Sequence, residues 1–130
     1  MIKKFLLIIL LLLPQAVTAA MILVGPNEKI TRIADAARVA KDGDTVLIMP
    51  GEYRGEVTTW VQKQLTIRGR GERPVLIADG KHAEGKAIWV IRNGSFLIEN
   101  IEFRNARVPD GNGAGIRLER GMLHVNVSNK

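Results

Sequence analysis

A pair of short apolar runs that recurs at a nearly fixed spacing constrains the fold of this chain more than any other feature. Residues 87–90 and 115–118 share one pattern of small, apolar, outward and apolar positions at an offset of 28. Residues 96–98 recur as residues 123–125 at an offset of 27. A fixed period marks a repeat fold, in which each unit buries its apolar face against the next. The spacing suits one rung of three short strands, so the sequence predicts an all-β solenoid.

The chain after residue 44 has the same character throughout. Short β-rich runs alternate with Gly, Asn and Asp turns, and no helix pattern separates them. This excludes an alternating βαβ sheet, and the repeat selects a solenoid over a sandwich or a barrel. The predicted strands are 45–49, 57–61, 65–68, 74–78, 87–91, 96–99, 101–104, 115–119 and 122–127.

One segment upstream of these strands has the pattern of an amphipathic helix. Its apolar residues follow the spacing that places them on one stripe. They are Ile30, Ile33, Ala34, Ala37 and Ala40. Asn27 or Thr31 is a candidate N-cap, and Gly43 suits the end of the helix. We therefore expect residues 21–44 to form a first strand and this helix, and residues 45–130 to form the rungs.

Two short stretches resemble a known superfamily. The run DGDTVLIMPGEYRGEV at residues 42–57 and the later ENIEF at residues 99–103 resemble the right-handed parallel β-helix of the pectin-lyase-like proteins. The resemblance implies that the helix caps the open end of the solenoid. It also implies that Asn100 occupies a turn where such folds stack asparagines, with Gly69 at that turn in the preceding rung. It decides no activity, because the superfamily includes polysaccharide lyases, hydrolases, epimerases and adhesins.

The N-terminus has the three parts of a secretory signal peptide. Two lysines, an unbroken apolar run at residues 5–13 and a small-residue stretch follow one another, with cleavage sites after Ala19 or Ala20. We therefore expect residues 1–20 to be removed and the protein to be periplasmic or extracellular. The alternative is an uncleaved membrane anchor, since residues 5–24 are long enough to span a bilayer.

Charge and cysteine content narrow the expected partners. Removal of the signal and its two lysines leaves 17 basic residues against 13 acidic ones, a net charge of +4, and the chain has no cysteine. The positive charges are dispersed among acidic and apolar residues, which argues against a nucleic-acid partner. Outside the cytoplasm, a mildly basic protein is expected to meet an acidic polysaccharide. Without disulfides, the domain must depend on its core and its hydrogen bonds.

Trp89 and Arg117 form the first candidate for ligand binding. They fall at equivalent positions of the 28-residue alignment, and both are expected to face outward from a strand. An exposed indole beside a guanidinium suits a sugar-stacking platform with a clamp for a carboxylate. The alternative is a cation–π pair on a solvated face of the sheet.

The loop at residues 79–86 is the second candidate. It combines Asp79, His82 and Glu84 with two lysines, so an acid, a base and a cation are present in one inserted loop. The same composition is found in ordinary exposed turns. No catalytic set can be assigned, and no metal site or cofactor is evident. Calcium is implied only by the family resemblance, because Asp110 and Asn112 fall short of the ligands that the ion requires.

The last rung lacks its third strand, since nothing after residue 125 repeats the ENIEF stretch. We expect a truncated β-helix whose open last rung self-associates. The leading functional hypothesis is an exported repeat protein that binds or processes an acidic polysaccharide. If it is an enzyme, a lyase or epimerase is expected, with catalytic residues missing from this chain. The alternative is a non-enzymatic structural or adhesive module, or a nonfunctional fragment.

Overall fold

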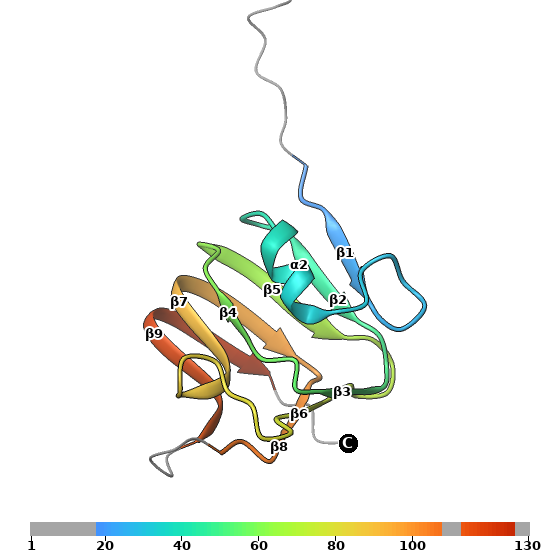
Figure 1. Ribbon diagram of the computed structural model, residues 1–130. Helices are drawn as coiled ribbons and strands as arrows, with labels where there is room; N and C mark the ends of the chain where they lie inside the picture. Colours follow the sequence, from blue (N-terminus) through green and yellow to red (C-terminus); the bar gives the residue numbers. More distant parts are fainter. Residues whose placement is uncertain (1–17, 108–112, 127–130) are drawn as a thin grey trace, which may run out of the picture.

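The computed structural model describes residues 18–107 and 113–126 (Figure 1). Within them the chain winds into a parallel β-solenoid of about four turns with one short helix, which confirms the predicted fold class. Residues 1–17, with most of the predicted signal, lie outside the described residues, as do Asp110 and Asn112. The elements are β1 (Met21–Val24), α2 (Ile33–Val39), β2 (Thr45–Ile48), β3 (Glu52–Arg54), β4 (Thr58–Trp60), β5 (Gln64–Gly69), β6 (Val75–Ile77), β7 (Ala87–Glu99), β8 (Glu102–Arg104) and β9 (Ala114–Asn126).

Each full turn of the solenoid has three faces. On the first, β1, β2, β5 and β7 lie side by side, and β9 pairs with β7 (Figure 1). β3, β6 and β8 form the second face as a separate three-stranded sheet. The long strand β7 contributes to the first face and to the third. Its residues 95–99 pair with β5 on the first face, and its residues 89–91 pair with β4 on the third. All these pairings are parallel, as stacked rungs require.

Two features of the strands differ from the sequence prediction. β3 was not predicted, because its three residues contain a single apolar side chain, Tyr53, which is too short a pattern to recognise. The runs at 87–91 and 96–99 form one continuous strand, β7, and β9 is likewise continuous. Asn93 bends β7 between the two faces with a left-handed φ of 58°, so the strand turns a corner without ending.

Inward side chains stack on their equivalents in the neighbouring rungs. Val46, Ile67 and Ile98 follow one another in register, and each is at most 1 % exposed. The register between β7 and β9 is 27 residues along its whole length, so the predicted offset of 28 for the first run is wrong. A shift by one residue exchanges the two sides of a strand. This shift changes the interpretation of the candidate site.

Helix α2 is shorter than predicted and is held by side chains of the next rung. Ile30 forms a bridge with Val24 instead of a first helical turn, and neither predicted N-cap residue is used. The backbone N–H of Ile33 donates to Glu56 Oε1 at 2.8 Å. Ile33 and Ala36 are fully buried in the main core. No helix within residues 18–107 and 113–126 is long and apolar enough to cross a membrane.

Asn100 occupies the turn expected of it. Its φ of 55° is left-handed, and its side-chain amide donates to the carbonyl oxygens of Gly69 at 2.9 Å and Gly71 at 3.1 Å in the preceding rung. A β-carbon at Gly69 would lie 2.1 Å from the Asn100 carbonyl oxygen, so only glycine fits there. The contact therefore joins one asparagine to backbone carbonyls in the preceding rung.

Candidate functional site

The candidate site is the outer surface of the third face, together with the loop that packs on it and the corner at which it ends. It is built by β4 and by residues 82–93 and 114–121. We call it the β4–β7–β9 surface. Thr59, Val90 and Arg117 lie in register on its three strands and point away from the core. Neighbouring rungs place such residues about 4.8 Å apart. These side chains form a ladder along the solenoid axis. Val90 is fully buried beneath Ala83 of the loop, so Thr59 and Arg117 are the accessible members of the ladder.

The loop at residues 79–86 packs onto this surface. Ala83 is 6 % exposed and forms with Ala87 and Val90 of β7 a buried cluster separate from the main core. The N–H of Ala83 donates to the carbonyl of Ala87 at 2.7 Å, which ties the loop to the strand. His82 Nδ1 accepts the N–H of Gly85 at 2.9 Å, so the imidazole shapes the loop itself. This anchoring fixes the position of the next residue, Glu84.

Glu84 lies at the centre of a hydrogen-bonded network. Its carboxylate accepts the Thr59 hydroxyl at 2.9 Å and Arg92 Nε at 3.3 Å, and it forms a second bond with the Arg92 guanidinium. The hydrogen bonds from Arg92 and then from Thr59 lower the pKa of Glu84 against the opposing effect of burial. The network thus joins β4, the loop and β7 through one ionised carboxylate.

Glu119 on β9 is the second carboxylate of the surface. It stands in register with Arg92, accepts Lys86 Nζ at 2.6 Å and lies 4.0 Å from Arg117 Nε. The hydrogen bond from Lys86 lowers the pKa of Glu119. A general acid needs a raised pKa, so neither carboxylate is suited to donate a proton near neutral pH. The arrangement favours binding over acid–base chemistry.

Basic side chains outnumber these acids on the same surface. Arg117 has half of its side chain exposed, and among the described residues its single ion-pair contact is the long one with Glu119. Arg120 forms no ion pair with any described residue, and it lines a hollow of about 320 Å³ with Arg92, Asn93 and Glu119. The surface therefore carries four cationic groups, those of Lys86, Arg92, Arg117 and Arg120, against two carboxylates.

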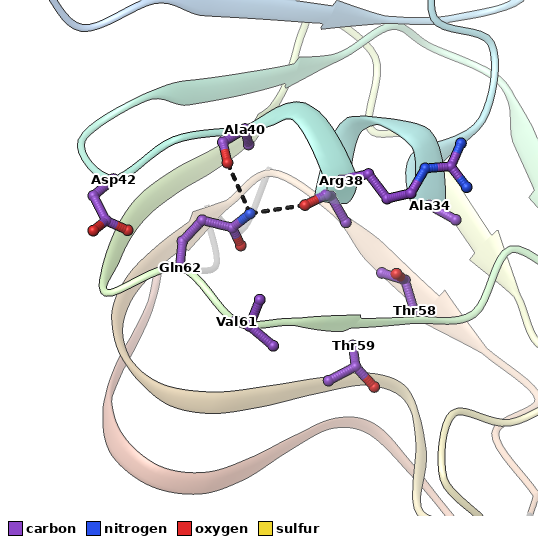
Figure 2. Close-up of a pocket in the computed structure, with 9 residues that line it drawn as sticks. Ala34, Arg38, Ala40, Asp42, Thr58, Thr59, Val61 and Gln62 are labelled. Atoms are coloured by element: carbon purple, nitrogen blue, oxygen red, sulfur yellow. Dashed lines mark hydrogen bonds between the residues drawn. The ribbon is translucent and has the colours of Figure 1, made fainter.

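A second hollow adjoins the ladder at Thr59. It lies between α2 and the strand β4 and has a volume of about 520 Å³ (Figure 2). Thr58, Thr59 and Asp42 supply polar groups, and Val61, with 65 % of its surface exposed, supplies an apolar one. Small alanines of α2 leave the space open. The hollow combines hydroxyl and apolar surface, which suits a sugar ring.

Gln62 closes one side of this hollow. Its amide nitrogen donates to the carbonyls of Ala37 at 2.8 Å and Ala40 at 3.0 Å, as Figure 2 shows, and so caps the C-terminal end of α2. Two carbonyl partners fix which amide atom is the nitrogen. The Oε1 atom is buried and has no hydrogen-bond partner among the described residues. Gln62 is 7 % exposed, so its main role is to hold the helix in place.

The structure corrects the expected role of Trp89. Trp89 is fully buried, because in the true register it pairs with Ile116 and faces the core. Its ring packs edge-on against Trp60 and Phe103 at centroid distances of 5.3 and 5.0 Å. Arg117 pairs instead with Val90 and faces outward as predicted. The proposed sugar-stacking platform of Trp89 beside Arg117 is therefore wrong.

The predicted loop residues have different positions. Glu84 joins the ladder, whereas the exposed residues Asp79 and His82 share no ion pair with it among the described residues. Asp79 has a left-handed φ of 51° and forms the turn into the loop. Sequence reasoning missed Thr59 and Glu119. The correct offset of 27, which pairs Glu119 with Arg92, was the signal that could have identified Glu119.

Residues 18–107 and 113–126 contain no group of three or more His, Asp or Glu side chains placed to hold a metal ion. Comparison of the chain with models of protein families, with curated proteins and with solved structures found no match. The assignment of function therefore depends on the geometry of the β4–β7–β9 surface.

Proposed function

We propose that this protein is an exported β-helix repeat protein that binds an acidic polysaccharide along the β4–β7–β9 surface. The main support for the proposal is the positive charge of this surface. Four cationic groups and two carboxylates lie on adjacent rungs of one face. Guanidinium groups bind carboxylates through paired hydrogen bonds, which makes arginine well suited to uronate recognition. A polymer that runs along the solenoid axis would meet the cations of the β7 rung and then those of the β9 rung.

The proposed kinship with right-handed, pectin-lyase-like β-helices supports this assignment by analogy of fold, since that superfamily includes many carbohydrate-active proteins. The resemblance of residues 42–57 to a first rung of that superfamily is the basis of the analogy. The lowered pKa values of Glu84 and Glu119 make both carboxylates weak bases, because cationic partners already bind them. This favours binding over the proton abstraction that a lyase or epimerase requires. The hollow beside Val61 and Thr59 extends the surface with room for a further ring.

The test compares binding of polygalacturonate and alginate with binding of neutral dextran. The double variant Arg117→Ala/Arg120→Ala removes two cations that form no short ion pair with a described residue, so the fold should be little affected. Each charge-assisted hydrogen bond contributes about 1.5–3 kcal/mol, so we expect a loss of affinity of about ten-fold or more. Binding of the unchanged protein should weaken as salt is added.

The matched control is Arg54→Ala/Arg104→Ala on the β3–β6–β8 face. It removes the same charge from side chains that are similarly exposed, at 57 % and 50 %. We expect it to retain the original affinity apart from a small loss due to net charge. Equal losses in the two double variants would show that net charge alone attracts the polymer, and absence of binding would refute the proposal.

A second candidate function, self-association as a structural or adhesive module, is favoured by exposed apolar side chains on β9. Met122 is 70 % exposed and Val125 is 47 % exposed. Measurement of molar mass by light scattering over a range of concentrations tests it. Met122→Ser/Val125→Ser should shift an associating protein toward monomer, and a monomer at every concentration would exclude this candidate.

A further inference from the structure

A buried carboxylate holds the beginning of the described chain. Asp44 is 5 % exposed, and its Oδ1 accepts the backbone N–H of Ala20 at 2.9 Å while its Oδ2 accepts that of Lys41 at 2.8 Å. The N–H of Thr45 donates to the carbonyl of Ala20 at 3.0 Å. Both backbone groups of Ala20 are thus bonded to a two-residue segment at the start of β2. A residue at the end of an edge strand can leave one of these groups bonded to water, whereas Ala20 has both groups bonded to the protein.

The direction of the Ala20 N–H follows from the strand geometry. The carbonyls of Ala20 and Val24 accept from Thr45 and Met49 of the neighbouring chain segment. In a parallel pair, alternate residues turn both backbone groups toward the partner strand. Ala20 therefore faces β2, whereas the backbone groups of Met21 face the open edge. The nitrogen of Ala20 is the one that reaches Asp44.

We infer that export processing cuts the bond between Ala19 and Ala20, and that Asp44 binds the α-ammonium group which the cut releases. In this step water hydrolyses the amide bond: the Ala19 carbonyl carbon gains an oxygen and leaves as a carboxylate, and the Ala20 nitrogen becomes a protonated primary amine. The inference depends on the proposed export, but not on polysaccharide binding. It assigns Asp44 a role in the mature protein.

The surroundings of Ala20 suit a charged terminus. Ala20 is exposed, so water can solvate the ammonium hydrogens that do not bond to Asp44. Backbone hydrogen bonds from Ala20 and Lys41 lower the pKa of Asp44, and the carboxylate is therefore ionised before any cut. The ionised carboxylate already accepts a charge-assisted bond from the Ala20 N–H. Cleavage also makes the donor cationic, so direct attraction between opposite charges is added to that hydrogen bond. The mature end should therefore hold β1 on β2 more firmly than the uncut chain does.

A cut one residue later has the opposite effect. A chain that starts at Met21 leaves Asp44 Oδ1 without the partner it has in the structure. Its ammonium group would lie on the side of β1 that faces away from β2. Of the two cleavage sites that the sequence offers, the structure thus favours the one after Ala19.

The test compares three mature chains released with defined ends from a cleavable fusion: one that starts at Ala20, one that starts at Met21, and one with a single glycine before Ala20. The glycine keeps the Ala20 N–H but moves the charge by one residue. The Ala20 chain should melt roughly 4 °C or more above both others. In Asp44→Asn, the added glycine should no longer change the melting temperature.

Equal melting temperatures for the Ala20 chain and the glycine-extended chain would overturn the role of Asp44, and this comparison needs no folded Asp44 variant. The mass of the protein recovered after export tests the cut itself. A mature chain that begins at Ala20 supports the inference, and one that begins at Met21, or that retains the signal, overturns it.

Discussion

The substitution Trp89→Ala tests whether the indole of Trp89 is packed in the core of the solenoid. The side chain is fully buried, and its ring contacts those of Trp60 and Phe103 edge-on. Truncation of a buried Trp costs about 3–5 kcal/mol through lost burial and the cavity left behind. Two edge-on ring contacts, at roughly 0.5–1.5 kcal/mol each, place this site toward the upper part of that range. A loss of about 4 kcal/mol is a large share of the stability of a small domain.

The assay is urea unfolding followed by circular dichroism, with Trp89→Phe beside Trp89→Ala. The phenylalanine variant keeps a ring between its two neighbours and removes the Nε1 donor, which is buried without a hydrogen-bond partner in the described part of the chain. It should therefore lose much less stability than the alanine variant. A loss below about 0.5 kcal/mol for Trp89→Ala is the range of surface substitutions. That result would restore the exposed platform and refute the register.

Three further predictions concern stability. Gln62→Ala removes the hydrogen bonds to the last carbonyls of α2 and should lower the free energy of unfolding by about 1 kcal/mol. The urea midpoint measures this loss, and an unchanged midpoint would contradict the capping role. Gly69→Ala places a carbon against the Asn100 carbonyl and should cost about 1–3 kcal/mol, whereas the same change at the exposed Gly80, which has open space around it, tests backbone strain alone. Folding lowers the pKa values of Asp44 and Glu84 from 3.8 and 4.5 in the unfolded chain. The stability that these two carboxylates contribute is therefore fully present at a pH above the unfolded pKa values. It is lost as the pH falls through the lower pKa values of the folded state. Melting curves between pH 7 and about pH 2.5 should show this loss, and Asp44→Asn should reduce it; a melting temperature independent of pH would contradict it.

The repeat was sufficient to predict the fold class, because inward residues such as Ile67 and Ile98 must alternate with outward ones in every rung. The exact register between β7 and β9 was not predictable from the pattern of apolar residues. Offsets of 27 and 28 both align apolar residues over residues 87–90, since Ile88, Trp89 and Val90 are apolar without interruption. Only the pairing of the complete strands distinguishes the two, and it places Trp89 inside the core.

Contacts between distant segments explain the rest of the differences. Helix α2 begins at Ile33 because Glu56 bonds its first N–H from 23 residues away, and local capping rules do not include such a partner. Glu84 was a plausible site residue by composition, but its partner Thr59 lies 25 residues upstream. The position of the loop depends on Ala83, whose burial against Val90 no local pattern indicates.

The central claim is that the β4–β7–β9 surface binds an acidic polysaccharide, and chemical-shift mapping by NMR tests it most directly. Isotopically labelled mature protein is titrated with a short uronate oligosaccharide, and a neutral oligosaccharide of equal length is the control. We expect amide shifts confined to residues 58–62, 82–93 and 114–121, with the largest near Arg117 and Arg120, and none with the neutral compound. Shifts centred on β3, β6 and β8, or no shifts at all, would contradict the account.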